Sequence, residues 1–194
     1  MQAFLSQIGY NVWILPALLV IPLVGALLLL VMGAFSSDDG TLEAARSARW
    51  IALLVFVIEF VVSMGLWWSY DPGGARWQAT YDHWWIVPWN ARLSMGIDGI
   101  SLMMVLLTTV IMPLAVLGSW TSIRIKVRSY YALMLVLTTG MLGVFVSRDL
   151  LLFYVMWEIM LVPMYFIIGI WGGERRIYAS LKFFVYTMAG SLLM

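Results

Sequence analysis

Six long apolar segments, separated by short polar connections, make up most of the sequence. Several of them reach the ~20 residues that an α-helix needs to cross a hydrocarbon layer about 30 Å thick. The apolar runs are continuous rather than alternating, which argues against the strands of a membrane barrel. The pattern therefore predicts an all-α, polytopic bundle of transmembrane helices. The predicted helices are residues 13–32, 50–68, 100–120, 130–146, 150–171 and 177–194.

The longest connection, residues 69–98, is rich in aromatic side chains. Tryptophan and tyrosine gather where a membrane meets water, because one end of each side chain is apolar and the other polar. We therefore expect an interfacial belt or a short surface hairpin here, rather than a ligand site. The aromatic residues are Trp77, Tyr81, Trp84, Trp85 and Trp89.

The distribution of lysine and arginine predicts the orientation. Connections that follow the first, third and fifth segments carry seven such residues, and the other connections carry three. Cytoplasmic loops are the ones enriched in positive charge, so the N-terminus is predicted outside. The seven are Arg46, Arg49, Arg124, Lys126, Arg128, Arg175 and Arg176, and the three are Arg76, Arg92 and Arg148.

Composition agrees with a membrane protein and excludes several kinds of chemistry. The chain is 63% hydrophobic and 11% charged, with a mean hydropathy of +0.96. It has no cysteine, which excludes disulfides, thiolate metal sites and iron–sulfur clusters on this chain, and a single histidine, His83, cannot form a bis-histidine haem pair. No phosphate-binding glycine loop follows a strand, and a net charge of +1 gives no sign of a nucleic-acid partner. Redox or nucleotide chemistry would therefore take place on other chains.

Glu158 is the main candidate for function. It lies ~12 Å into the fifth segment, close to mid-membrane, where a charge costs ~2.5–3.5 kcal/mol. Tyr154 and Tyr165 share its helical stripe, and Pro163 lacks an N–H and so frees a carbonyl beside the acid. Such a group of oxygens could admit water and move a proton. The alternative is an acid kept protonated by a neighbouring helix for packing.

Two further charged residues lie inside the apolar segments. Lys182 enters the sixth segment by little more than one turn, between Tyr178 and Tyr186, and either takes part in proton transfer or extends to the cytoplasmic interface. Glu59, the midpoint of the second segment, is a secondary candidate. Only Ser63 on its stripe is polar, which favours a neutral acid bonded to another helix.

Two residues are expected to shape the third segment. Asp98 in GIDGIS precedes a helix N-terminus, where a carboxylate accepts free N–H groups, so we predict a cap rather than a proton relay. Pro113 frees the carbonyl of Thr109 and predicts an irregular point in the helix, as Pro163 does in the fifth. The sixth segment ends in AGSLLM without a cap or polar flank, so we expect the sequence to be the N-terminal part of a longer chain.

The sequence LLLFYVMWEIMLVPMYFIIGIWGGERRIYASLKFF, with MGIDGISL and SRDLLLFYVMWE, resembles an antiporter-like membrane subunit of respiratory complex I, the proton-pumping NADH:quinone oxidoreductase. The similarity is greatest to the type called M in bacteria or 4 in mitochondria. It covers residues 92–194 well and the first ninety residues by layout.

This resemblance implies a fourteen-helix fold with two inverted repeats, of which the chain holds six helices. Glu158 matches a fifth-helix glutamate that pairs with a lysine on the seventh helix, which would lie beyond Met194. Lys182 matches a sixth-helix lysine, whereas Glu59 departs from the family, which has a neutral residue there. FMN, iron–sulfur clusters and the quinone site are expected on other subunits, and the partners are neighbouring antiporter-like subunits and the lipid of a bacterial or mitochondrial inner membrane.

The sequence therefore predicts a proton-translocating membrane-arm subunit without a redox centre of its own. One alternative is a sodium/proton antiporter subunit of the related multisubunit family. Another is a truncated scaffold that only holds neighbouring subunits.

Overall fold

The computed structural model describes residues 7, 9–35 and 42–193. Its elements are α2 (Tyr10–Phe35), α3 (Leu42–Ser69), β1 (Gln78–Ile86), the 3₁₀ turn η1 (Val87–Trp89), β2 (Ala91–Ile97), α4 (Gly99–Ser119), α5 (Val127–Val146), α6 (Leu150–Trp171) and α7 (Arg176–Leu192). Five helices, α2 to α6, are long and apolar enough to cross a membrane, and α7 has 17 residues. The predicted multi-pass helical bundle is confirmed.

The start of α3 differs from the prediction. The helix begins at Leu42 rather than at residue 50, because the preceding LEAARSAR consists mainly of strong helix formers. Ala44 and Ala48 on these first turns are buried against the bundle. Arg49 donates from Nη2 to the carbonyl of Ile123 at 2.9 Å, which joins the top of α3 to the α4–α5 connection. Hydropathy alone missed these two turns because their exposed face is charged.

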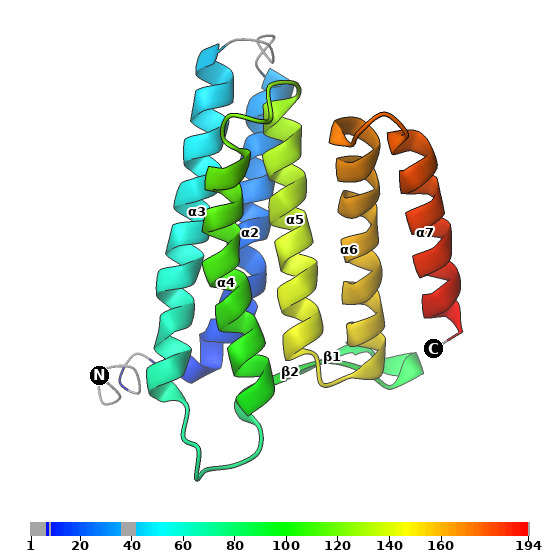
Figure 1. Cartoon of the computed structure of the whole chain (residues 1–194). Helices are drawn as coiled ribbons and strands as arrows, with labels where there is room; N and C mark the ends of the chain where they lie inside the picture. The colour runs from blue at the N-terminus through cyan, green and yellow to red at the C-terminus, as the bar shows by residue number, and fades with distance from the viewer. Residues whose placement is uncertain (1–6, 8, 36–41, 194) are drawn as a thin grey trace.

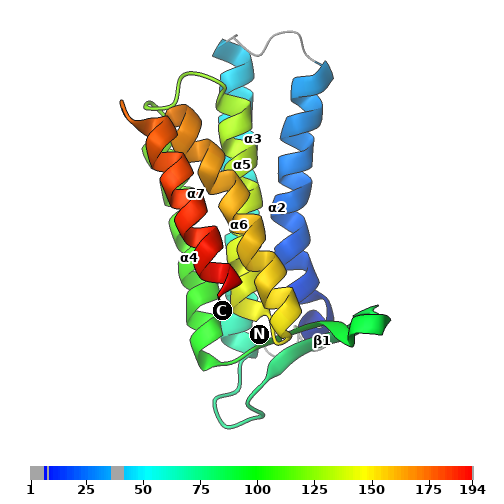
Figure 2. The same cartoon turned by 90° about the vertical axis from the view of Figure 1, so that its right-hand side faces the viewer.

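The helices form a four-helix bundle with a two-helix layer attached to one side. α2, α3, α4 and α5 pack around a common interior, α6 packs against α5, and α7 packs against α6. Figure 1 shows α6 and α7 beside the bundle, and in the turned view of Figure 2 these two helices lie in front of α4 and α5. Many side chains on the outer faces of the bundle helices are apolar and exposed, as a hydrocarbon surrounding requires.

Two glycines bring α5 and α6 into close contact. A β-carbon at Gly140 would lie 2.5 Å from Cγ of Met160, and one at Gly143 would lie 2.6 Å from Sδ of Met156. Small residues at such points allow membrane helices to approach closely and pack well. The contact fixes which face of α6 turns toward the bundle, namely the face that carries Met156 and Met160.

The interior of the four-helix bundle contains two apolar clusters with polar groups between them. The cluster nearer the hairpin includes Leu66, Val105 and Leu142, and the cluster nearer the other end includes Phe56, Met112 and Leu135. In α3, α4 and α5 the residues between these two sets include buried polar side chains, which we call the polar layer. They are Glu59, Ser63, Thr109, Thr138 and Thr139.

A hydrogen bond across the polar layer connects two helices. The hydroxyls of Ser63 on α3 and Thr109 on α4 lie 2.8 Å apart. A hydrogen bond between side chains of membrane helices contributes about 0.6 kcal/mol on average. Pro113 lies one turn beyond Thr109 within α4, as the sequence predicted, and its ring removes the N–H that would otherwise bond the Thr109 carbonyl.

The aromatic connection forms a two-stranded antiparallel hairpin, one of the two arrangements predicted for it. β1 pairs with β2, and Asn90 turns the chain with a left-handed φ of 52°. Arg92 pairs with Asp82 at 3.1 Å and lies over the ring of Trp84, 4.1 Å from its centroid. The hairpin runs beneath the helices toward α6 (Figure 1).

The connection between α5 and α6 consists of three residues, 147–149, as predicted, and it is held against β2. The N–H of Arg148 donates to the carbonyl of Ser94 at 2.9 Å. Asp149 caps α6 by accepting from the N–H groups of Leu151 and Leu152, at 2.9 and 3.1 Å. The entry of the chain into α6 is therefore fixed by both a cap and a strand contact.

Asp98 caps α4, which confirms the sequence prediction. Its Oδ1 accepts from the N–H groups of Ile100 and Ser101, at 3.1 and 2.8 Å, and the Ser101 hydroxyl accepts from the N–H of Asp98. The hydrogen bond from the backbone N–H of Ser101 lowers the pKa of Asp98 below its ordinary value of 3.8. The reciprocal bonds form a capping box.

Opposite ends of the bundle should face opposite sides of the membrane. Gly173, in the α6–α7 turn, and Gly73, before β1, are both exposed and lie at opposite ends of the helices. Because the chain contains no cysteine, a single cysteine at either position gives an unambiguous label. We expect an impermeant thiol reagent to reach Gly73→Cys from outside and Gly173→Cys only from the cytoplasmic side. Labelling of both from one side would contradict this topology.

The charge on Asp98 should stabilise the fold in a pH-dependent manner. Because the folded pKa is depressed, the contribution is present above pH 3.8 and is lost as pH falls below that value. Asp98→Asn keeps an acceptor but loses the charge, and should lower the free energy of unfolding by about 0.3–1 kcal/mol near neutral pH. Asp98→Ala removes both the acceptor and the charge, so it should lose about 1 kcal/mol even at low pH and more than that near neutral pH. Thermal unfolding in detergent at several pH values tests this, and identical pH profiles for wild type and Asp98→Asn would contradict it.

Candidate functional site

Glu158 lies in the middle of α6 and faces α7. Met156 and Met160 contact α5, and each is two residues from Glu158, or ~200° around the helix. The carboxyl group therefore points away from the four-helix bundle. Its Oε1 accepts a hydrogen bond of 2.6 Å from the hydroxyl of Ser191 on α7. The structure thus pairs the predicted acid with a neutral hydroxyl group from the neighbouring helix.

Ser191 is a site residue that the sequence analysis missed. It is 7% exposed, and its Oγ also lies 3.0 Å from the carbonyl oxygen of Met188 in the preceding turn. In the sequence, Ser191 lies within AGSLLM, the apolar segment that follows Met188. A usable signal was present, since a small polar residue inside an apolar helix commonly faces another helix.

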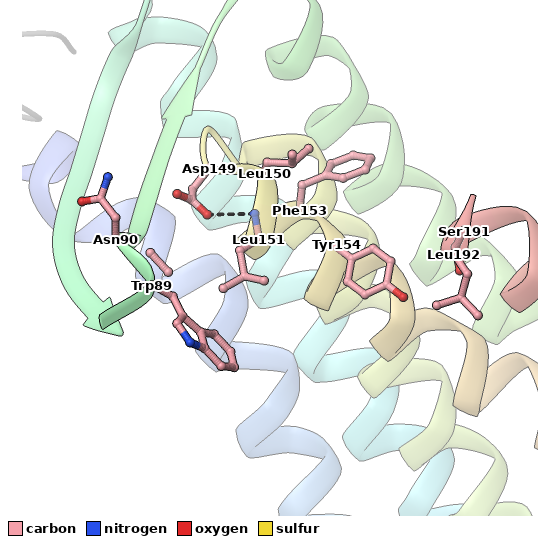
Figure 3. Close-up of a pocket in the computed structure, with 10 residues that line it drawn as sticks. Trp89, Asn90, Asp149, Leu150, Leu151, Phe153, Tyr154, Ser191 and Leu192 are labelled. Atoms are coloured by element: carbon pink, nitrogen blue, oxygen red, sulfur yellow. Dashed lines mark hydrogen bonds between the residues drawn. The ribbon is translucent and has the colours of Figure 1, made fainter. Parts of the chain in front are cut away.

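The two tyrosines predicted beside Glu158 lie on its side of α6 but form no hydrogen bond with it among the described residues. Tyr165 packs against α7, with its ring centroid 5.5 Å from that of Phe184. Tyr154 extends toward the end of α7 (Figure 3). Pro163 is buried within α6. Because proline has no N–H, the carbonyl group of Ile159, four residues earlier, lacks its usual helical hydrogen bond.

Lys182 does not approach Glu158. It lies nine residues before Ser191 on α7, which is ~13.5 Å along the axis and half a turn around it. Its side chain is exposed, with Nζ 5.8 Å from the centroid of the Tyr178 ring. Within the described residues, Lys182 therefore faces away from α6, and its predicted role in proton transfer remains a proposal.

A cavity of about 530 Å³ opens beside this site. It lies between the tip of the hairpin, the first turns of α6 and the last turn of α7 (Figure 3). Ser191 belongs to its lining and also bonds Glu158, so the cavity reaches the first partner of the acid. The lining residues are Trp89, Asn90, Ala91, Asp149, Leu150, Leu151, Phe153, Tyr154, Ser191 and Leu192.

Glu59 has a different environment from Glu158. It is completely buried inside the four-helix bundle, with an exposed fraction of 0%. The predicted hydrogen bond to another helix is wrong, since neither carboxyl oxygen has a partner among the described residues. Ser63, its polar neighbour on α3, bonds Thr109 and the carbonyl of Phe60 instead. Glu59 is therefore buried against protein but has no hydrogen-bond partner among the described residues.

The described residues do not contain a group of three or more histidine, cysteine, aspartate or glutamate side chains placed to hold a metal ion. The acids in the helices are separate from one another. Glu59 lies on α3 inside the bundle, and Glu158 lies on α6 outside it.

The chain has the antiporter-like transmembrane fold, which similar sequences and solved structures share. Residues 147–194 match the family model described as the transmembrane region of NADH:quinone oxidoreductase and Mrp antiporters. The chain is 44% identical over 174 residues to NADH-quinone oxidoreductase subunit M of Rhodobacter capsulatus, covering 90% of this chain and 33% of that protein. It is 38% identical over 179 residues to chain 4 of NAD(P)H-quinone oxidoreductase from Microcystis aeruginosa, covering 92% and 32%.

Solved structures agree with these relatives. A chain of respiratory complex I from Thermus thermophilus superposes with a TM-score of 0.74 at 26% identity, covering 92% of this chain and 33% of that one. A chain of the Mrp complex from a Dietzia species has the same fold, with a TM-score of 0.71 at 17% identity, and covers 92% and 18%. The chain described here is a partial homologue of NADH-quinone oxidoreductase subunit M and chain 4, and it spans about a third of their length.

The carboxyl group of Glu59 should contribute little to the free energy of unfolding, because it has no polar contact among the described residues. A buried carboxyl group without hydrogen-bond partners is destabilising, so replacing it with an apolar side chain of similar length removes that cost. We expect Glu59→Met to unfold at the same temperature as wild type or higher, with a gain of up to about 2 kcal/mol. Ser63→Ala, one turn away, should be destabilising by about 0.6 kcal/mol because it loses the bond to Thr109.

Thermal unfolding of the purified protein in detergent provides the measurement for both variants. A clear loss of stability in Glu59→Met would contradict the expectation and show that the carboxyl group has a bonding partner.

Proposed function

We propose that this chain takes part in proton translocation as a portion of a membrane-arm subunit of NADH:quinone oxidoreductase, and that Glu158 takes up and releases the proton. The observation that carries the proposal is the placement of Glu158. It is the acid that the structure holds mid-helix on the α7 side of α6, with one hydrogen-bonding partner that can rotate. The matches to subunit M and chain 4 supply the context in which this acid would act.

The surroundings of Glu158 suit reversible protonation of its carboxyl group. An opposite charge at contact distance changes the proton affinity of a carboxyl group by about 10- to 1000-fold. The resemblance implies that this charge is a lysine from a helix outside residues 1–194. Reduction of quinone elsewhere in the complex would change the electrostatic field along a chain of such groups, and protons would load and leave in response.

Other residues have supporting roles in the proposal. Pro163 leaves a carbonyl of α6 without its helical bond, which offers an acceptor near the acid. Tyr154 lines the cavity that reaches Ser191, and Tyr165 packs α6 against α7. Lys182, on the outer face of α7, would interact with groups beyond the described helices. FMN, iron–sulfur clusters and quinone would bind to other subunits.

Proton transfer is favoured over sodium transport. A sodium ion, as a hard cation, requires several oxygen ligands around it. Among the described residues, Glu158 has one hydroxyl group as its side-chain partner. Stimulation of transport by sodium in the assembled complex would instead support the multisubunit antiporter interpretation.

Glu158→Gln in the assembled complex should inactivate the site without preventing folding. The amide keeps the size of the side chain and an acceptor for Ser191, but it cannot release a proton. We expect proton translocation and NADH oxidation to fall together by about tenfold or more, which corresponds to about 1.4 kcal/mol of barrier. Glu174→Gln, an exposed acid in the α6–α7 turn, serves as the control and should leave both rates unchanged.

Relocating the carboxyl group checks the geometry. Adding Tyr154→Glu to Glu158→Gln moves the acid by four residues along one stripe, whereas Trp157→Glu turns it by ~100°. We expect some return of activity in the first double variant and none in the second. Normal pumping by Glu158→Gln alone would refute the role and leave Glu158 as a packing residue.

A further inference from the structure

The hydroxyl group of Ser191 lies between two acceptors. Its Oγ is 2.6 Å from Oε1 of Glu158 and 3.0 Å from the carbonyl oxygen of Met188. A serine hydroxyl has one hydrogen to donate and two lone pairs that accept. It can therefore donate fully to only one of these two oxygens at a time, and rotation about the Cβ–Oγ bond selects which one.

We propose that Ser191 is a positioning residue that bonds Glu158 in both of its protonation states; this inference rests on the proposed function of Glu158. When the carboxyl group is ionised, Ser191 donates its hydrogen to Oε1. When Glu158 has taken up a proton, its O–H donates to Oγ, and Ser191 turns its own hydrogen to the carbonyl of Met188. The carboxyl group then keeps a hydrogen bond to Ser191 through the whole cycle, while the transferred proton stays on Glu158.

The change in direction of the hydrogen bond between Ser191 and Glu158 matters because Ser191 is buried. Ser191 is 7% exposed, so solvent is largely excluded from its side chain. A hydrogen bond to a charged group in a low-dielectric site is strong, and leaving one partner without it is costly. A partner that only donates, such as a lysine, would favour the ionised acid, and one that only accepts would favour the neutral acid. The hydroxyl serves both states without movement of either helix.

The charged groups on the elements around α6 do not compete with this bond. On α7, Lys182 lies on the opposite face of the helix. On β2, Arg92 is paired with Asp82. On α5, Arg128 donates to the carbonyl of Met32 on α2. The remaining charged or titratable residues are Tyr130 and Tyr131 on α5, Arg176, Tyr178 and Tyr186 on α7, and Tyr154, Tyr165 and Asp149 at α6, none of which bonds Glu158 in the described structure.

Ser180 provides a matched control on the same helix. It is 2% exposed, and its hydroxyl donates to the carbonyl of Ile177 three residues earlier, just as Ser191 can donate to Met188. Ser180 has no contact with Glu158 among its described hydrogen bonds. Loss of either hydroxyl removes the same local bond, but only Ser191→Ala removes the partner of the acid.

The test compares Ser191→Ala, Ser191→Thr and Ser180→Ala in the assembled complex. We expect the acid-side fall of the pumping-rate profile to move to higher pH by about one unit in Ser191→Ala, because the charge-assisted hydrogen bond lost by the ionised carboxyl group is stronger than the bond lost by the neutral acid. The maximal rate should fall by about tenfold. Ser191→Thr keeps the hydroxyl and should restore the profile, and Ser180→Ala should leave it unchanged.

Infrared difference spectroscopy provides a readout that does not depend on pumping. The C=O stretch of protonated Glu158, assigned by its loss in Glu158→Gln, should shift in Ser191→Ala and return in Ser191→Thr. An unshifted band and an unchanged pH profile in Ser191→Ala, with pumping still dependent on Glu158, would overturn the role of Ser191. Normal pumping by Glu158→Gln, with a shifted band in Ser191→Ala, would instead overturn the proposed function while confirming the contact.

Discussion

The close contact between α5 and α6 is the constraint on which the rest of the site depends. Gly140 and Gly143 leave no room for a β-carbon, so the side chains of Met156 and Met160 fill the space between the two helices. Helical geometry then determines the direction of every other residue on α6, including Glu158. The three-residue connection before α6, held by the Asp149 cap and by β2, prevents the helix from sliding along this contact.

Glu59 and Glu158 show how surroundings decide what a carboxyl group can do. Glu59 lies in a sealed bundle with no described partner, where ionisation would leave a buried charge without compensation. Glu158 lies at the edge of the bundle, between two helices, and bonds a hydroxyl group that can either donate or accept. The sequence places both residues near the middle of an apolar helix. Only the packing of the helices distinguishes them.

Most of the fold follows from the sequence because a bilayer leaves the backbone few alternatives. Hydropathy and local chemistry can be read from a few neighbouring residues in the sequence. They predict the six helices, the short turn at Arg148 and the Asp98 cap. The early start of α3 was missed because the exposed face of its first turns is charged, which hides strong helix formers from a hydropathy pattern. The partner of Glu158 was missed because it comes from another helix, since Ser191 is 33 residues away in the chain.

The division between a four-helix bundle and a two-helix layer suits a site that must change its charge. In the bundle, buried contacts on all sides leave little freedom, which makes α5 a firm support for α6. On the other side of α6, the proposed exchange at Glu158 would need a hydroxyl rotation rather than a helix movement. Rotation of an O–H costs far less than rearranging packed helices, so the backbone would stay in place during that exchange. The rigid contact at Gly140 and Gly143 and the rotatable group at Ser191 are therefore complementary requirements of the same site.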